Sequence, residues 1–357
     1  MMRELLEKIK LISPGSPLRK ALDDIMRANT GALIVLLDNP EEYKDVIQGG
    51  FKIDVPFEPE YLYELSKMDG AIVISEDVSR IYFANVHLIP DPTIPTFETG
   101  MRHRTAERFA KQLGKVAIAV SRRRNLITLY YKSHKYVVND TALVISRVTQ
   151  AINTLEKYRK NFDKLLMELD IMELENRTTV FDVAKVMEKG VMVLKISEEI
   201  KPFLVELGEE ARLAKMQVEE LTENASDILE LLVMDYSESE IEKERAEEII
   251  ENLAKSPTLD LVKIARSLGY SVQATSQLDD IQVEARGYRL LKYIAKIPMS
   301  ISRKVVEMFR NIFSISQASI DDLKSVEGIG NKRARAIVDS IHSLKMRKTA
   351  ISESDVE

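Results

Sequence analysis

The chain has 357 residues, enough for two or three domains, and 45% of them are hydrophobic while 30% are charged. This composition is typical of globular proteins and excludes a largely disordered chain. The absence of cysteine excludes disulfide bonds, thiolate catalysis and cysteine-bound metals, and the net charge of -6 argues against nucleic-acid binding over the whole surface.

The first 140 residues combine helical and strand patterns. An amphipathic stretch over residues 1–29, interrupted at Pro14 and Gly15, predicts helical structure, and further helices are predicted near 58–67 and 101–113. Short apolar runs rich in β-branched residues predict strands at 32–37, 71–74, 81–84, 116–120, 126–131 and 136–138, the last two as a hairpin. This alternation predicts an α/β domain over 1–140 with a central mixed sheet flanked by helices.

From about residue 141 to 288 the strand pattern disappears. Long periodic stretches at 149–174, 211–232 and 241–254 predict an all-α middle domain, a helical linker in which we identify no chemistry. The strongly acidic segment 237–251 is interpreted as a solvated helix face.

A third, small all-α domain is predicted over residues 289–357, where the charge changes sign. Residues 291–350 contain twelve lysines and arginines against five aspartates and glutamates. A basic region on an acidic chain is a local electrostatic footprint for phosphate backbones. Within it, residues 323–338 have the sequence LKSVEGIGNKRARAIV, which predicts a helix, a tight turn and a second helix.

This turn has the features of a phosphate-binding hairpin. The glycines at 328 and 330 permit positive φ and close approach of another backbone, while Asn331 can cap the second helix so that its free N–H groups point outward. The segment resembles the helix-hairpin-helix motif of proteins that bind DNA without reading its base sequence. The candidate DNA-binding residues are Gly328, Ile329, Gly330, Asn331, Lys332, Arg333 and Arg335.

Two alternatives accompany this interpretation. The glycines can simply serve the geometry of an ordinary helical turn. A weaker copy of the motif over residues 297–306 lacks both glycines, and we interpret it as a degenerate structural partner.

Three segments of the first domain carry candidate chemistry. Asp69 lies in an Asp-Gly turn just ahead of a predicted strand, where its carboxylate can bind a divalent metal or orient a ribose hydroxyl. The segment at 100–108, GMRHRTAER, concentrates cations and a hydroxyl at a predicted helix start, which favours binding of a polyphosphate. Ser121 and the arginines at 122–124 follow the strand 116–120 and form a possible second phosphate clamp. Asp69 and the residues of segment 100–108, taken alone, are more often turn or surface residues, and segment 121–124 can equally be a basic turn into the next strand.

In combination, Asp69-Gly-Ala71 and Arg102-His-Arg-Thr-Ala106 match the two signatures of diadenylate cyclase domains. The order of cyclase domain, helical linker and helix-hairpin-helix domain resembles the DNA-scanning branch of that family over essentially the whole chain. The resemblance implies condensation of two ATP into cyclic di-AMP and two pyrophosphates across facing protomers, with Mg²⁺ or Mn²⁺. It also implies a homo-octamer whose synthesis is suppressed by branched DNA bound at the C-terminal domain.

The resemblance also implies the roles of individual residues. The catalytic set is Asp69, which also binds the metal, with Arg102, His103, Arg104 and Thr105. The ATP-binding set adds Gly70, Ala71, Leu88, Met101, Ser121, Arg122 and Arg124. Relatives that lack the DNA domain often carry an acid after the serine, where this chain has Arg122, so the metal's full ligand set stays open.

Two other functions remain compatible with the sequence: a non-catalytic helix-hairpin-helix scaffold on DNA, and a nucleotidyltransferase that acts on another acceptor. We expect no membrane span, because no run of eighteen apolar residues occurs. A cytoplasmic location is expected because the amphipathic N-terminus lacks the apolar core of a signal peptide.

Overall fold

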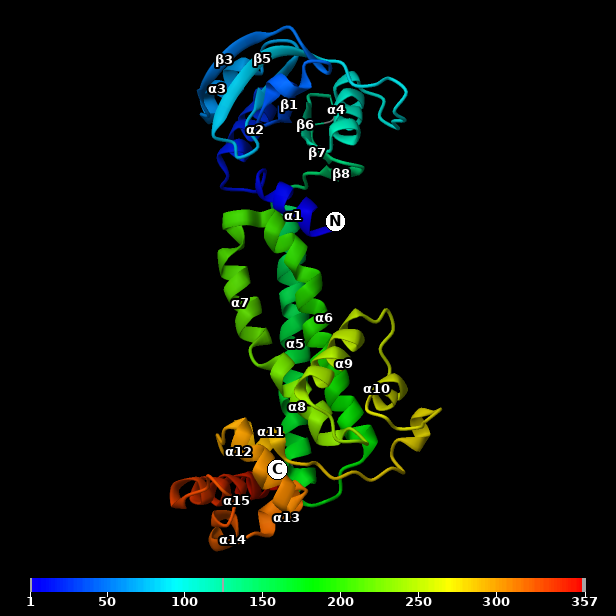
Figure 1. Cartoon of the computed structure of the whole chain (residues 1–357), viewed down its shortest axis with the longest axis vertical. Helices are drawn as coiled ribbons and strands as arrows, with labels where there is room; N and C mark the ends of the chain where they lie inside the picture. The colour runs from blue at the N-terminus through cyan, green and yellow to red at the C-terminus, as the bar shows by residue number, and fades with distance from the viewer. Residues whose placement is uncertain (1, 124, 355–357) are drawn as a thin grey trace. The chain divides into compact units, whose positions relative to one another are not determined.

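The structure is a computed structural model that describes residues 2–123 and 125–354 (Figure 1). The chain divides into two compact units, which are treated separately below. The first comprises residues 1–150 and 200–216, and the second comprises 151–199 and 217–357. The boundaries 1–140, 141–288 and 289–357 stay a prediction from the sequence.

An eight-stranded mixed sheet organises the first unit, which has the predicted α/β fold. All six predicted strands are present, and two short strands precede the third helix without having been foreseen. The strands are β1 (Ala32–Leu36), β2 (Ile47–Gln48), β3 (Phe51–Pro56), β4 (Ala71–Ile74), β5 (Arg80–Leu88), β6 (Val116–Ser121), β7 (Leu126–Tyr131) and β8 (His134–Val137).

The strand directions decide which chain segments meet at each end of the strands, which is called an edge of the sheet below. The order is β2-β5-β4-β1-β6-β7-β8, with β3 also paired to β5. β1 runs parallel to β4 and antiparallel to β6, with Ala32 opposite Val120. The segments that lead into β1 and β4 therefore lie at the same edge as the segment that leaves β6.

Helices cover both faces of this sheet, as the alternation along β1 requires (Figure 1). Ile34 belongs to the core shared with α2 (Pro17–Arg27) and α3 (Pro59–Leu65), which also receives side chains from α1 (Met2–Lys10). Val35 belongs to the opposite core, shared with α4 (Met101–Leu113). The short η1 (Pro40–Tyr43) follows β1. The first unit is thus a three-layer sandwich with helices outside.

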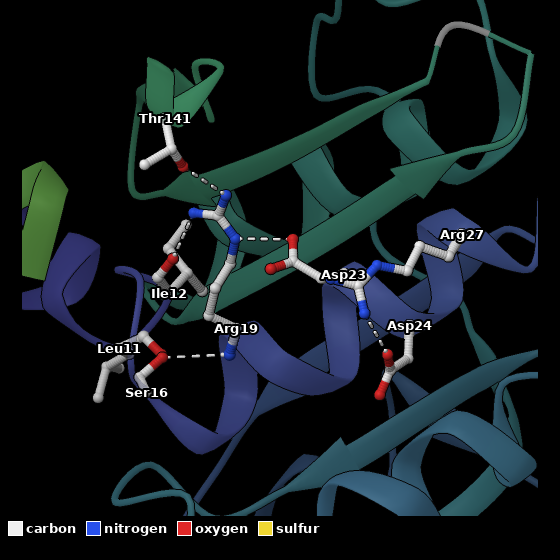
Figure 2. A network of polar contacts seen from close by, with 8 residues as sticks. All are labelled: Leu11, Ile12, Ser16, Arg19, Asp23, Asp24, Arg27 and Thr141. Atoms are coloured by element: carbon white, nitrogen blue, oxygen red, sulfur yellow. Dashed lines mark hydrogen bonds and ion pairs between the residues drawn. The ribbon is translucent and has the colours of Figure 1, made fainter. Parts of the chain in front are cut away.

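Polar contacts fix the start of α2, as Figure 2 shows. Ser16 caps the helix by accepting a hydrogen bond from the Arg19 backbone at 3.1 Å. The Arg19 guanidinium donates to Asp23 at 2.8 Å, to the Ile12 carbonyl at 3.3 Å and to the Thr141 hydroxyl at 3.5 Å. These contacts tie α2 to the turn before it and to the first residue of α5.

Helices build the rest of the chain, as predicted for the middle and C-terminal regions. They are α5 (Thr141–Leu174), α6 (Val180–Leu207), η2 (Gly208–Ala211), α7 (Arg212–Thr222), α8 (Ala225–Tyr236), α9 (Lys243–Lys255), α10 (Leu261–Ser267), η3 (Thr275–Gln277), α11 (Tyr288–Tyr293), α12 (Met299–Phe309), α13 (Ile312–Gln317), α14 (Ile320–Lys324) and α15 (Asn331–Ser354). The continuous helix expected over 211–232 is broken, because Asn224 adopts a positive φ of 58° between α7 and α8. Among the described residues, no helix is long and apolar enough to span a membrane.

A buried charge cluster joins three helices of the second unit. Arg289, in α11, pairs with Asp170 at 2.5 Å and with Glu173 at 2.9 Å, both in α5. Asp235, near the end of α8, accepts hydrogen bonds from the backbone N–H groups of Gly287, Tyr288 and Arg289 at 2.7–3.0 Å. Sequence analysis assigned no role to these residues, whose contacts anchor the first turn of α11 to α5 and α8.

Burial controls the protonation of this cluster. Burial raises the pKa of Glu173 to about 7, because the opposing attraction of Arg289 compensates only part of the desolvation. Burial also raises the pKa of Asp235 despite the N–H groups that it accepts. Glu173 additionally accepts a hydrogen bond from Tyr236 at 2.5 Å.

Candidate functional site

A cavity of about 780 Å³ lies in the first unit at the edge where β1 and β4 begin and β6 ends. This volume is in the range of small-molecule sites. The described residues that line it are Asn29, Asp69, Gly70, Gly100, Met101, Arg102, His103, Val120, Ser121, Arg122 and Arg123. All three sequence segments proposed to carry the chemistry therefore contribute to one cavity.

The sheet register explains this convergence. Asp69 and Gly70 lie immediately before β4, and Ser121 is the last residue of β6. Because β6 is antiparallel to β1, and β1 is parallel to β4, these two segments reach the same edge from opposite directions. Gly100 and Met101 begin α4, which packs on one face of the same strands.

The backbone conformation at position 70 requires glycine. Its φ is 89°, in the region that favours glycine, and a Cβ atom there would lie 2.8 Å from the Asn85 carbonyl carbon and 2.9 Å from the Val86 oxygen. The turn that presents Asp69 is therefore pressed against β5. Asp69 itself is exposed at the cavity and belongs to no hydrogen bond or ion pair within the described residues.

His103 is buried and held by a chain of polar groups. Its Nδ1 lies 2.9 Å from the Tyr130 hydroxyl, which donates to Glu98 at 2.9 Å. Because Tyr130 uses its hydrogen on Glu98, its oxygen accepts a hydrogen bond from Nδ1–H of His103. Burial raises the pKa of Glu98, but hydrogen bonds from Lys135 and Tyr130 outweigh it and hold that pKa below its usual value. The imidazole is thereby fixed at the cavity wall.

The cavity wall is electropositive. Arg102, Arg122 and Arg123 line it, and Asp69 is the one carboxylate among the described lining residues. None of the three arginines forms an ion pair in the described part of the chain, whereas Lys111 of α4 pairs with Glu107 at 2.7 Å. Unpaired guanidinium groups around one acid suit a polyphosphate with a nearby hydroxyl.

Other predicted residues lie outside this lining. Ala71 is buried in the core beneath α4, and Leu88 ends β5 opposite Ile47 of β2. Arg104 and Thr105 are partly buried in the first turns of α4. Arg124 lies outside the described residues. The roles of these five residues stay predictions.

Sequence analysis missed part of the wall. Asn29 follows α2 with a positive φ of 54°, and Val120 lines the cavity from the end of β6. An Asn between an amphipathic helix and a strand is a recognisable helix-ending residue, but its place at the cavity depends on the strand order. Arg108, by contrast, is not among the lining residues and donates to the Ile94 carbonyl at 2.9 Å.

No group of three or more acids and histidines that could hold a metal ion occurs among the described residues. A site that fits Mg²⁺ or Mn²⁺ here has a different form. Mg²⁺ is commonly held by one or two carboxylates together with substrate phosphates, and Asp69 can supply that carboxylate.

The second candidate site is the turn between α14 and α15. Gly328 adopts a φ of 93°, so this position requires glycine. Gly330 has no positive φ, and a Cβ atom there would have open space around it. The expectation that both glycines serve positive φ is therefore wrong for Gly330. The Gly330 carbonyl accepts from Ala334 at 3.0 Å, so Gly330 and not Asn331 holds the cap position.

The side chains of this turn divide into anchors and exposed groups. Ile329 is buried, and Arg333 donates to the Gly328 carbonyl at 2.6 Å, which braces the turn. Lys332 and Arg335 are exposed and belong to no ion pair within the described residues. Lys332 and Arg335 are three residues apart in the first turns of α15, so they lie on one side of this helix, close to its free backbone N–H groups.

The weaker copy of the motif folds as a second hairpin between α11 and α12. Lys296 adopts the positive φ that Gly328 has in the other hairpin, at 54°. The Pro298 carbonyl accepts from Ile301 and Ser302 at 2.9 Å, as Gly330 does from Ala334. The missing glycines therefore do not prevent a positive φ and a capping carbonyl at this turn.

Comparison with protein families places both sites within known domains. Residues 19–135 match the DAC family model, described as the nucleotide-binding region of the DisA bacterial checkpoint controller. Residues 138–277 match the linker region of the same controller, and residues 314–340 match the helix-hairpin-helix motif. The chain thus combines a DAC nucleotide-binding domain, a helical linker and a helix-hairpin-helix DNA-binding domain.

Curated relatives resemble nearly the whole chain. Proteins named DNA integrity scanning protein DisA are 63% identical in Thermotoga petrophila over 98% of this chain and 99% of the relative, and 63% identical in Thermotoga maritima over 98% of both chains. The Clostridium tetani protein of the same name is 42% identical over 96% of this chain and 94% of the relative. The chain belongs to the DisA family.

Proposed function

We propose that this protein condenses two molecules of ATP into cyclic di-AMP and releases two pyrophosphates. The observation that supports this most is the cavity where Asp69 shares a wall with Arg102, Arg122 and Arg123, inside the span matched by the DAC nucleotide-binding model. One acid beside several unpaired cations is the combination that a sugar hydroxyl attacking a triphosphate needs.

The reaction consists of two equivalent displacements. The 3′-hydroxyl oxygen of one ATP forms a bond to the α-phosphorus of the other, the bond from that phosphorus to the β-phosphate oxygen breaks, and pyrophosphate leaves while the hydroxyl proton is released. The second displacement, with the roles reversed, closes the ring. If each cavity holds one ATP, two protomers must face each other, so a lone protomer is inactive. The homo-octamer implied by the family resemblance supplies such pairs.

Positioning and charge neutralisation supply most of the catalysis. Asp69 orients the attacking hydroxyl or the metal, Arg102 and His103 meet the departing pyrophosphate, and Ser121 contacts phosphate. Asp69, together with the substrate phosphates, would hold Mg²⁺ or Mn²⁺, and the ion would supply further charge neutralisation. The further ATP contacts proposed from the family resemblance are Gly70, Ala71, Leu88, Met101, Arg104, Thr105, Arg122 and Arg124.

We further propose that branched DNA binds the hairpin between α14 and α15 and suppresses synthesis. The exposed cations Lys332 and Arg335 and the positive φ at Gly328, which requires glycine, support this role. Contacts with phosphates predict affinity that falls steeply with salt and varies little with base sequence.

Incubation of the purified full-length protein with ATP and Mg²⁺ alone tests the activity. Mass spectrometry should detect cyclic di-AMP without any added acceptor. Asp69→Asn should abolish the product, while Asp45→Asn, at an exposed carboxylate of the same unit outside the cavity, should leave it unchanged. Absence of product from the native chain would favour a scaffold or a different nucleotidyltransferase. Retained synthesis in Asp69→Asn would remove Asp69 from the mechanism.

The DNA response is tested by the ratio of synthesis with and without a four-way junction. Gly328→Val should bring that ratio to one, because valine resists a φ of 93° and the turn must rearrange. Gln317→Ala, at an exposed position of α13 outside the turn, should keep the inhibition. Inhibition that persists in Gly328→Val would exclude this turn as the sensor.

A further inference from the structure

Gly31 is the residue between the α2 turn and β1, and its missing side chain leaves space that Arg102 fills. A Cβ atom at Gly31 would overlap Nη1 of Arg102 and would lie 3.2 Å from its Cζ atom. The same Cβ atom would lie 3.1 Å from the Val120 carbonyl oxygen. The guanidinium of Arg102 therefore rests against bare backbone where β1 begins and β6 ends.

The backbone conformation does not explain this glycine. Gly31 is absent from the glycines with positive φ, whereas Asn29 in the same turn has a φ of 54°. An alanine can adopt the Gly31 backbone conformation, so the contact with Arg102 is what a side chain would disturb. Gly70, at the same cavity, differs because its φ of 89° alone disfavours any other residue.

Arg102 has no other anchor in the part of the chain that the structure describes. It forms no hydrogen bond or ion pair within the described residues, and it lines the cavity. Arg108, two turns along α4, is by comparison committed to the Ile94 carbonyl at 2.9 Å. A guanidinium that is placed by packing but carries no counter-ion keeps its hydrogen-bond donors available for an anion, at little cost in ordering when that anion binds.

We propose that Gly31 is a positioning residue that holds the Arg102 guanidinium toward the triphosphate of a bound nucleotide. This inference rests on the proposed function for the identity of the ligand. A methyl group at Gly31 would push the guanidinium out of its space and toward solvent. The N–H donors of the guanidinium would then lose conformational freedom each time a triphosphate binds.

A double-mutant cycle on the full-length protein tests the proposal. ATP binding is measured with 3′-deoxy-ATP, which lacks the attacking hydroxyl and therefore cannot react, by calorimetry in the presence of Mg²⁺ for the native chain, Gly31→Ala, Arg102→Ala and the double variant. Gly31→Ala should weaken ATP binding by about tenfold, which equals about 1.4 kcal/mol. In the Arg102→Ala background the same substitution should change the affinity by less than about twofold, because the group that it displaces is gone.

Adenosine serves as the matched ligand without phosphates. Its affinity, measured by competition, should be the same for the native chain and for Gly31→Ala if the substitution acts only on phosphate contacts. An equal loss of ATP affinity in both Arg102 backgrounds, an equal loss for adenosine, or no loss at all would each overturn the proposal.

Folding is checked by thermal melting of each variant. Should Gly31→Ala alone fail to fold, the double variant with Arg102→Ala must recover the native melting temperature, since only the 3.1 Å contact with the Val120 oxygen remains. Failure of both would assign the glycine to backbone packing and overturn the proposal. Binding is measured without turnover, so this test does not depend on the reaction. A lack of cyclic di-AMP would refute the proposed function, whereas the coupling between Gly31 and Arg102 in nucleotide affinity would still be measurable.

Discussion

The cavity of the first unit and the charge cluster of the second use the same residue types in opposite ways. Arg102 and Asp69 lie at a cavity and have no partner within the described residues. Arg289 and Glu173 are buried and bound to each other at 2.9 Å. A charge that is removed from water must be paired, while a charge that serves a ligand must stay unpaired until the ligand arrives. Pairing, more than residue type, therefore separates charges that hold the fold from charges that are available for chemistry.

The largest effect that the comparison predicts comes from Arg289. Arg289→Ala leaves Asp170 and Glu173 buried without their cation, so the free energy of unfolding should fall by about 3–5 kcal/mol. Arg102→Ala is the matched change at an unpaired arginine, and it should alter stability by no more than about 0.5 kcal/mol. Both are measured by urea denaturation followed by circular dichroism. Equal losses in the two variants would break the distinction between structural and available charges.

A smaller effect is expected from pH. The pKa of Glu173 is raised from 4.5 to about 7 by burial, so its contribution to stability is fully present below pH 4.5 and is lost as pH rises through 7. Glu173→Gln should remove this loss, so that its stability relative to the native chain improves by about 1–3 kcal/mol between pH 4.5 and 8. Glu168→Gln, at an exposed position of the same helix, is the control. A difference between native chain and Glu173→Gln that does not change with pH would show that Glu173 does not titrate in this range.

The smallest effect concerns the hairpin between α14 and α15, where one arginine is bound to the backbone and another is unpaired. Arg335 is unpaired within the described residues, so Arg335→Ala should weaken DNA binding and lower the slope of log affinity against log salt by about 0.9, the value for one phosphate contact. Arg333 braces the Gly328 carbonyl at 2.6 Å, so Arg333→Ala should also lower the melting temperature. Fluorescence anisotropy at several salt concentrations and thermal melting measure the two quantities. An unchanged salt slope in Arg335→Ala would remove that side chain from the DNA surface.

Contiguous features of this molecule were predictable from sequence. The six apolar runs form strands because β-branched side chains pack well on a buried, pleated sheet. The Gly328 turn and the start of α4 were visible as local motifs. β2 and β3 escaped notice because β2 has only two residues and the side chains of β3 are exposed or partly exposed. The break at Asn224 escaped because the apolar period continues through it.

Features that depend on strand order were not predictable. Asn29 reaches the cavity, and Gly31 reaches the Arg102 guanidinium, only because β1 lies between β4 and β6, and no local pattern reveals that order. The cluster around Arg289 unites residues from α5, α8 and α11, whose charges are individually ordinary in a helical region. Sequence thus indicated the candidate residues for the chemistry, and the sheet topology decides which of them meet.

The central place of β1 has a consequence for how long the cavity survives thermal fluctuation. β1 is hydrogen-bonded on both sides, and every residue of β1 and β4 is buried. Amide protons in such strands exchange with deuterium only when the whole domain opens, whereas those of the outer strands β2 and β8 exchange through local fraying. Because the cavity lies where β1, β4 and β6 start or end, its geometry is attached to the slowest-exchanging part of the first unit and should persist until that unit melts.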